Sequence, residues 1–276
     1  MEEKNYRVLR IEEQLYGCEE LPEGQPVLCD VLLEAADGTQ RVLPYPDAEL
    51  TRLDINEGST VTLRDHRLAK AAHKVYFTRH GETVWNRHHK VQGVADIPLA
   101  ENGILLAEKT GEALKNVSFD LCITSPLVRA RKTAELILAK QAHKVPVKED
   151  IRIREINFGV LEGVVCMNDA REYLDPQMKK FFTDPWNFDR PKDGESIRDV
   201  LARTKEFWEE LIHNPKLQDK TILIATHGCC MRALLRNVYE DKNDFWHGGV
   251  PYNCAVSIIE VQNGVSTLLA DNKIYY

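Results

Sequence analysis

From residue 75 onward, short apolar runs alternate with segments of helical periodicity. This alternation predicts an α/β fold with a mainly parallel sheet and helices on both faces. The apolar runs are typical of buried strands: Val75–Phe77, Asp120–Thr124 and Thr221–Thr226. The segments expected to form helices are Glu101–Lys115, one that begins at Ser125-Pro126, Ser196–His213 and Gly228–Asn237. Two further runs, Ala255–Glu260 and Ser266–Ala270, flank Asn263-Gly264 and predict a closing β-hairpin.

Two of the expected helices have recognisable starts. Ser125 is expected to be an N-cap, and Pro126 suits the first turn because it has no N–H to leave unpaired. Ser196 and Asp199 have the spacing of a capping box, which predicts that the long helix begins directly after Ser196.

Residues 1–72 have a β-rich pattern instead, and we expect a small N-terminal all-β domain, either a sandwich or a barrel. Turn signals at 36–39 and 56–58 separate some of its strand-like runs. These runs are Tyr6–Ile11, Val27–Leu33, Arg41–Pro44 and Ser59–Leu63.

No side-chain constellation in this N-terminal region predicts chemistry. Cys18 and Cys29 are expected to be core residues, because no His or Cys accompanies them at metal-binding spacing. The segment Asp65–Lys74 is expected to be a polar linker, and its residues His66 and His73 are not expected to hold a metal ion.

Charge and cysteine usage argue against several classes of protein. The net charge of -7, without a long basic run, argues against nucleic-acid or anionic-membrane partners. No apolar segment approaches the roughly 18 residues of a membrane span, and the charged start Met1–Lys4 lacks the apolar core of a signal peptide. The seven cysteines form no CxxC pair, and the adjacent Cys229-Cys230 is expected to pack within a helix. A reduced, cytoplasmic location is therefore expected.

Four motifs place cationic, imidazole and carboxyl groups at strand ends or helix starts. Arg79-His80-Gly81-Glu82-Thr83 follows a predicted strand, at the end where open α/β sheets hold their ligand sites. The others are Ser125–Ala134, Arg154–Gly159 and Ala225–Gly228. In this order the motifs resemble the signature of the histidine phosphatase superfamily over about residues 74–270. The resemblance implies a phosphoglycerate-mutase-like fold, with a phosphatase domain at 73–276 and a separate accessory domain at 1–72.

The resemblance also implies that His80 accepts the phosphoryl group and that Arg79, Arg129 and His227 contact the phosphate. The chemistry of the residues agrees with these roles. An attacking imidazole must be neutral, and neighbouring guanidinium groups favour that form. Guanidinium groups bind phosphate oxygens as a bidentate fork. The nitrogen of His80 that does not attack is expected to be oriented by a hydrogen bond to the backbone.

Glu155 is the expected general acid, because it occupies the carboxylate position of the E-x-x-F/Y-G segment of the family. We expect burial to hold it protonated until it donates to the leaving alkoxide. It would then activate the water that hydrolyses the phosphohistidine. Glu82 and Glu195 are the competing carboxylates.

The remaining expected site residues bind the substrate. Gly228 begins a helix whose N-terminal amides favour an anion. Lys90 stands where the family often has Arg, and a lysine offers a point charge in place of a fork. No metal and no cofactor is expected. The substrate-binding set is Asn86, Glu82, Gln92, Gly93 and Gly228.

Phosphomonoester hydrolysis on a small phosphorylated metabolite is the expected activity. The segment 161–192 lacks the adjacent Arg-Arg pair of the cofactor-dependent phosphoglycerate mutases, although a mutase stays the alternative. A phosphate-sensing binding module is a second alternative. The β-rich domain could bind a partner, help to form a homodimer or cover the active site, and its sequence does not choose among these roles.

Overall fold

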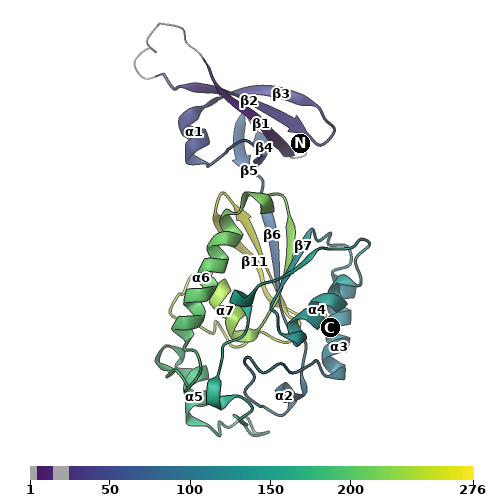
Figure 1. Ribbon diagram of the computed structural model, residues 1–276, viewed down its shortest axis with the longest axis vertical. Helices are drawn as coiled ribbons and strands as arrows, with labels where there is room; N and C mark the ends of the chain where they lie inside the picture. The colour runs from purple at the N-terminus through teal and green to yellow at the C-terminus, as the bar shows by residue number, and fades with distance from the viewer. Residues whose placement is uncertain (1–4, 15–24) are drawn as a thin grey trace. The chain divides into compact units, whose positions relative to one another are not determined.

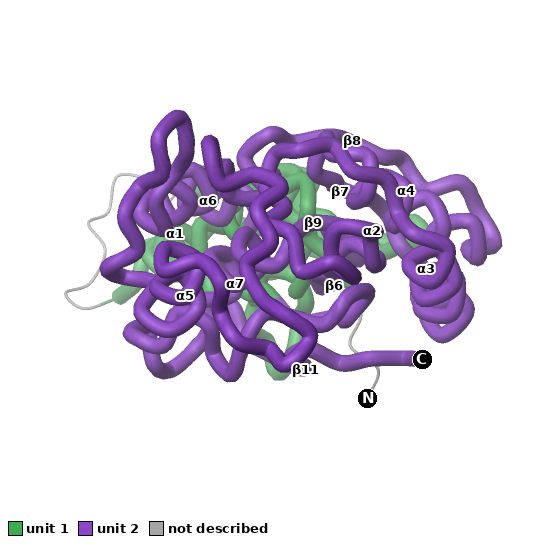
Figure 2. Tube along the Cα trace, turned by 90° about the horizontal axis from the view of Figure 1, so that it is seen from below, with its two compact units in different colours: residues 1–73, 212–219, 261–265 green, residues 74–211, 220–260, 266–276 purple. Residues whose placement is uncertain are grey.

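The computed structural model describes residues 5–14 and 25–276, so the predicted core residue Cys18 lies outside the described residues. The chain divides into two compact units, coloured in Figure 2. Unit 1 consists of residues 1–73, 212–219 and 261–265, and unit 2 consists of residues 74–211, 220–260 and 266–276. The sequence predicted one domain boundary, after residue 72. Unit 1 also contains two later segments, residues 212–219 and 261–265, which that boundary assigns to the second domain.

Unit 1 contains an antiparallel sheet with the strand order β3-β2-β1-β4-β5. Alternate side chains of β2 point inward, so Val31 and Leu33 pack with Val8 and Val61 in a small core. This single five-stranded sheet differs from the expected sandwich or barrel. Its elements are β1 (Asn5–Glu13), β2 (Leu28–Ala35), β3 (Gln40–Pro46), α1 (Asp47–Arg52), β4 (Thr60–Arg64) and β5 (Arg67–Lys70).

The prediction of a polar linker over Asp65–Lys74 is wrong. Asp65 and His66 adopt positive φ angles of 48° and 61° and turn the chain between β4 and β5. A two-residue hairpin needs this conformation, but Asp-His lacks the glycine that usually signals it. His73 is buried and begins the next strand, β6 (His73–Arg79).

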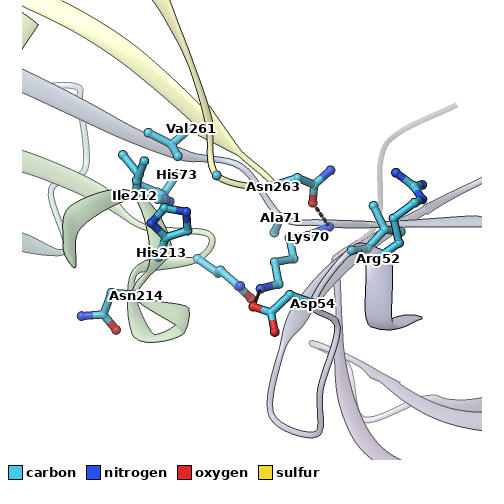
Figure 3. A pocket seen from close by; sticks show the side chains of 13 residues that line it. Arg52, Asp54, Lys70, Ala71, His73, Ile212, His213, Asn214, Val261 and Asn263 are labelled. Carbon is cyan, nitrogen blue, oxygen red and sulfur yellow. Dashed lines mark hydrogen bonds and ion pairs between the residues drawn. The ribbon is translucent and has the colours of Figure 1, made fainter. Parts of the chain in front are cut away.

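Unit 1 also encloses a polar cavity of about 240 Å³, shown in Figure 3. The Lys70 ammonium group lies 2.5 Å from the Asp54 carboxylate, and the Lys70 N–H donates to Asn263 Oδ1 at 3.0 Å. The Arg52 guanidinium group pairs with Glu49 at 2.7 Å. The charges of Lys70 and Arg52 are therefore compensated by neighbouring carboxylates.

Unit 2 is built on a six-stranded sheet with the order β11-β10-β6-β9-β7-β8 (Figure 1). β6 pairs in parallel with β9, β9 with β7, and β7 with β8. The remaining strands, β10 and β11, are joined by the two-residue turn Asn263-Gly264, which confirms the predicted closing hairpin. A hairpin joins antiparallel strands, so the sheet is mixed and only partly parallel. The added strands are β7 (Leu121–Thr124), β8 (Val147–Glu149), β9 (Thr221–Thr226), β10 (Val256–Gln262) and β11 (Val265–Lys273).

Helices cover both faces of this sheet, as predicted (Figure 1). Phe77 of β6 stacks on Trp208 of α6, whereas Leu223 of β9 packs with Ala134 of α4 on the other face. The helices are α2 (Val84–Arg87), α3 (Glu101–Ala113), α4 (Val128–Leu138), α5 (Pro176–Thr183), α6 (Ile197–His213) and α7 (Gly228–Leu235). Short 3-10 helices cover Ile151–Ile153, Gly159–Leu161, Pro185–Asn187 and Pro215–Leu217.

The two predicted helix starts have different outcomes. The capping box of α6 is confirmed, because Ser196 N–H donates to Asp199 Oδ2 at 2.7 Å and Asp199 N–H donates to Ser196 Oγ at 3.3 Å. The N-cap prediction for Ser125 is wrong, because α4 begins at Val128 after Leu127. Within the described ranges, none of the helices has the length and apolar character that crossing a membrane requires.

Candidate active site

Two histidines meet at the carboxyl ends of the adjacent parallel strands β6 and β9. Arg79 lies opposite Thr226 in the strand register, and the His80 N–H donates to the Thr226 carbonyl at 3.0 Å. The residue that follows each strand is a histidine, so both histidines lie at the same edge of the sheet. The ring centroids of His80 and His227 are 5.2 Å apart.

The His80 ring is held in one tautomer by its own loop. Nδ1 lies 2.7 Å from the Gly81 carbonyl, and because a carbonyl can only accept, Nδ1 carries the proton. Nε2 is then the nitrogen with the free lone pair. Burial, followed by the charges of Arg129 and Arg79, lowers the pKa of His80 well below its usual value of 6.5. The ring is thus neutral at pH 7, and the expected backbone hydrogen bond is present.

His227 is fully buried beside Ser125. Its Nε2 lies 2.7 Å from the Ser125 hydroxyl, and its Nδ1 has no hydrogen-bond partner in the described part of the chain. Burial and the charge of Arg129 lower the pKa of His227 well below 6.5. The Ser125 hydroxyl therefore contacts an imidazole, whereas the sequence had predicted that it caps a helix.

The two arginines are anchored by main-chain carbonyls. Arg79 donates from Nη1 to the Pro251 carbonyl at 2.6 Å, and Arg129 donates to the Ala95 and Gly93 carbonyls at 2.8 and 2.6 Å. The Nε atoms of both arginines are buried without a partner in the described residues. Burial lowers the pKa of Arg79 and lowers that of Arg129 to about 10, so both groups stay cationic at pH 7.

Glu155 reaches the start of helix α7. Its carboxylate accepts hydrogen bonds from the N–H groups of Cys229, Cys230 and Ile156 at 3.1, 3.1 and 3.0 Å. These contacts fix the carboxylate at the N-terminus of α7, beside the cavity. A Cβ at Gly228 would lie 2.7 Å from Val250 Cγ1, so a larger residue there would displace the Val250 side chain that lines the cavity.

A further carboxylate, Glu162, supports Arg129 and was not predicted. It accepts hydrogen bonds from the N–H groups of Gly93, Val94, Ala95 and Phe158 at 2.9 to 3.3 Å. The loop that Glu162 holds presents the Gly93 and Ala95 carbonyls to Arg129. The one sequence feature that could have pointed to Glu162 is its position, three residues after Gly159 of the Arg154–Gly159 motif.

The Glu195 carboxylate binds two arginines and a backbone N–H group in the chain next to Glu155. Its carboxylate pairs with Arg154 at 2.9 Å and Arg203 at 3.0 Å, and it accepts from the Asn157 N–H at 2.9 Å. Arg203 also donates to the Glu155 carbonyl at 3.1 Å. These contacts position Glu155, and Glu195 does not line the cavity described below.

The structure brings most, but not all, of the expected substrate-binding residues together. Asn86, Gln92 and Gly228 line one cavity, together with Lys90. Gln92 Oε1 accepts from the Thr83 hydroxyl at 2.5 Å, while its Nε2 is buried without a partner in the described residues. The Glu82 carboxylate instead contacts Arg87 at 2.8 Å and Asn102 at 3.0 Å, and Glu82 is not among the lining residues.

The cavity beside these groups has a volume of about 220 Å³. Arg79 and Glu155 line it at the sheet edge, whereas His80, Arg129 and His227 are buried and do not line it. Much of the rest of the lining is apolar: Val91, Phe158, Met167, Met178, Phe181, Phe182, Trp246 and Val250. In residues 5–14 and 25–276, no group of three or more His, Cys, Asp or Glu residues is arranged to hold a metal ion.

The described cysteines are free thiols, and both Cys229 and Cys230 are fully buried in α7. Burial raises the pKa of Cys229 and raises that of Cys230 to about 11, so both remain protonated at pH 7. The expectation that this pair packs within a helix is confirmed. Neither thiol contributes a nucleophile to the cavity.

Comparison with known proteins agrees with this geometry. A family model of the histidine phosphatase superfamily (branch 1) matches residues 75–273. The chain is 28% identical over 204 residues to the probable 2-carboxy-D-arabinitol-1-phosphatase of Arabidopsis thaliana, over 73% of this chain but only 41% of that protein. It is 34% identical over 160 residues to the 2,3-bisphosphoglycerate-dependent phosphoglycerate mutase 2 of Gloeobacter violaceus, over 57% of this chain and 71% of that protein.

Among solved structures, Bacillus stearothermophilus YhfR aligns with a TM-score of 0.64 and 30% identity, over 73% of this chain and 98% of that one. The region that the family model matches, residues 75–273, includes every motif around the two histidines and excludes most of unit 1. The chain belongs to the histidine phosphatase superfamily.

Proposed function

We propose that the protein hydrolyses phosphomonoesters through a covalent phosphohistidine on His80. One observation carries this proposal. Four side-chain nitrogens of the site are buried without a hydrogen-bond partner in the described residues: Arg79 Nε, Arg129 Nε, Gln92 Nε2 and His227 Nδ1. Buried donors without partners cost free energy, and one phosphate group offers oxygens enough to satisfy all of them. The charges of Arg79 and Arg129 act on the neutral His80 ring, whose free lone pair is on Nε2.

In the first step, His80 Nε2 attacks phosphorus and the bond from phosphorus to the ester oxygen breaks. Arg79 and Arg129 neutralise the charge on the phosphoryl oxygens. The Ser125 hydroxyl lies 2.7 Å from His227 Nε2, and in the tautomer in which it donates to Nε2, Nδ1–H of His227 is a further donor to the phosphate. Glu155 donates a proton to the ester oxygen as its bond to phosphorus breaks, so the alcohol leaves as a neutral molecule.

In the second step, water attacks phosphorus, the bond from phosphorus to Nε2 breaks, and inorganic phosphate is released. The Glu155 carboxylate, ionised after the first step, accepts the proton of that water. Two arginines and two histidines lie together at this sheet edge, and we propose that neither step requires a metal ion.

The lining of the cavity favours a hydrolase over a mutase. The relatives include both a probable phosphatase and a phosphoglycerate mutase, so family membership does not separate the two activities. A bisphosphorylated cofactor carries several negative charges, and each needs a cationic partner. Among the residues that the structure describes, Arg79 and Lys90 are the cationic residues that line the cavity, and much of the remaining lining is apolar.

Release of inorganic phosphate from a panel of phosphomonoesters, measured in EDTA, tests this proposal. The comparison is between the wild type, His80→Ala and the control His88→Ala, since His88 is exposed and does not line the cavity. We expect metal-independent hydrolysis that His80→Ala abolishes and His88→Ala preserves.

The panel includes 3-phosphoglycerate with and without 2,3-bisphosphoglycerate. Isomerisation to 2-phosphoglycerate without net phosphate release would assign the protein to the mutases and contradict the proposal. If no ester is turned over but phosphate still binds, the phosphate-sensing alternative replaces it.

A further inference from the structure

The lining of the catalytic cavity combines two chemically different groups of residues. Its polar and charged side chains include those of Arg79, Glu155, Asn86, Lys90 and Gln92. The second group, which we call the aromatic wall, consists of Phe158, Phe181, Phe182 and Trp246. A phosphate ester that binds in this cavity therefore has aromatic rings available to its leaving group.

The aromatic wall is closely packed. The ring centroids of Phe181 and Trp246 are 5.0 Å apart with an interplanar angle of 75°, and those of Phe182 and Trp246 are 5.8 Å apart. The Trp246 indole N–H donates to the Phe181 carbonyl at 2.9 Å, so the polar atom of this side chain is already satisfied. The wall can therefore offer ring faces and edges to a ligand without leaving a buried donor unpaired.

A second, more open groove of about 530 Å³ shares part of its lining with the cavity, since Phe182, Trp246 and Val250 line both spaces. The groove adds further aromatic residues: Tyr173, Trp186 and Phe245. Among the described residues, its lining includes Asp184 and Asp244 but neither Lys nor Arg, while the Arg236 guanidinium group lies 5.3 Å from the centroid of the Trp186 ring. This lining suits an uncharged leaving group better than an anionic one.

We propose that the preferred substrates are phosphomonoesters of alcohols that carry an uncharged aromatic ring a few bonds from the phosphate. The inference rests on the proposed function and extends it from the phosphate to the leaving group. The ring packs against Phe182 and Trp246 while the phosphate occupies the position between the arginines. The products are inorganic phosphate and the free aromatic alcohol, with one water consumed.

Polyanionic esters fit this cavity less well. A carboxylate or second phosphate on the leaving group would have Lys90 as the one cationic partner in the cavity lining besides Arg79. The Lys90 ammonium group itself lies over the Trp85 ring, 5.8 Å from its centroid. Additional negative charge would otherwise be placed against apolar side chains, which is unfavourable.

A series of esters with similar alkyl leaving groups tests the inference without the advantage that phenolic leaving groups have in any phosphatase. The probes are ethyl phosphate, 3-phenylpropyl phosphate and 3-phosphoglycerate. Burial of one phenyl ring predicts a kcat/KM for 3-phenylpropyl phosphate roughly 10- to 100-fold above that for ethyl phosphate. We expect 3-phosphoglycerate to gain no comparable advantage.

Phe182→Ala is the first variant, because Phe182 is only partly buried and lines both spaces. We expect it to lower the ratio of the two kcat/KM values by at least about threefold. Trp246→Phe, which keeps an aromatic core residue, should lower the same ratio. The matched control is Leu105→Ala, since Leu105 is an apolar residue of α3 that is 47% exposed and outside both spaces.

The outcomes separate the inference from the proposed function. Equal kcat/KM values for ethyl and 3-phenylpropyl phosphate, or a ratio that Phe182→Ala leaves unchanged, would overturn the substrate class while hydrolysis stands. Hydrolysis that persists in His80→Ala, or no hydrolysis of any ester, would overturn the proposed function itself.

Discussion

The His227 ring and the Ser125 hydroxyl lie 2.7 Å apart although 102 residues separate them in the sequence. Ser125 follows β7 and His227 follows β9, and these two strands are parallel neighbours in the sheet. The pairing of the strands therefore places a hydroxyl against the imidazole. This contact determines which nitrogen of His227 can face a phosphate.

Removing the Ser125 hydroxyl should impair catalysis more than folding. In Ser125→Ala, His227 Nε2 loses its partner and the ring is no longer held in the tautomer with Nδ1–H toward the phosphate. We expect kcat/KM to fall about tenfold, which corresponds to roughly 1.4 kcal/mol. The control is Ser257→Ala, which removes another buried hydroxyl, bonded to Asp271 at 2.6 Å, away from the cavity. Equal kinetic losses in both variants would contradict a specific role for Ser125.

The carboxylate candidates can be separated by isosteric amides. Glu155→Gln should lower kcat for alkyl phosphates by about 100-fold or more, because it removes the group that exchanges the proton. Glu82→Gln should stay within about threefold of the wild type, since Glu82 pairs with Arg87 and Asn102 outside the cavity. Steady-state kinetics on one alkyl phosphate decides between them, and a larger loss in Glu82→Gln would reverse the assignment.

Because Glu162 holds the loop at residues 93–95, replacing it should lower both the stability of the protein and its affinity for phosphate. In Glu162→Gln an amide nitrogen replaces one oxygen and faces backbone N–H donors, which should lower the free energy of unfolding by about 2 kcal/mol. The Gly93 and Ala95 carbonyls would move, and with them Arg129. We expect kcat/KM to fall by roughly 10- to 100-fold. Glu172→Gln, an exposed acidic residue bonded to Asn168, is the control that should change neither quantity.

The two buried imidazoles predict an acid-dependent loss of stability. The pKa values of His80 and His227 are lowered in the folded state, so below pH 6.5 the unfolded chain binds protons that the folded chain does not. Stability is then fully present above pH 6.5 and decreases as the pH falls below it, by at most about 2.7 kcal/mol per pH unit for two histidines.

Urea unfolding between pH 5.5 and 7.0 measures this dependence. Tryptophan fluorescence reports on unit 2, which contains all four tryptophans: Trp85, Trp186, Trp208 and Trp246. His80→Ala should roughly halve the slope of stability against pH. An unchanged slope in that variant would show that His80 titrates alike in both states.

Local sequence was sufficient to predict those features that a single short segment determines. The apolar runs before His80 and before His227 were both predicted as buried strands, and the structure shows these strands, β6 and β9, as parallel neighbours. The capping box at Ser196 is equally local. The β5 strand was missed because its Asp65-His66 turn lacks the usual glycine signal.

The supporting groups could not be identified in the same way. Glu162 acts through backbone N–H groups almost 70 residues earlier in the chain, and no side-chain pattern records such contacts. The aromatic wall draws Phe158, Phe181 and Trp246 from separate segments, and only their packing shows that they face one cavity. The contact of Glu82 with Arg87 could not be predicted, because the position of Glu82 in the first motif does not indicate the direction of its side chain.

The most direct test of the central claim is to trap the phosphoenzyme. The wild type is mixed with a [32P]-labelled alkyl phosphate, quenched in alkali, and analysed for label on the protein by peptide mapping. Phosphohistidine is stable in alkali and labile in acid, so we expect alkali-stable, acid-labile label on the peptide that contains His80. We expect no label in His80→Ala and normal labelling in His88→Ala. Label on another residue, or product formation without any labelled protein, would contradict nucleophilic catalysis by His80.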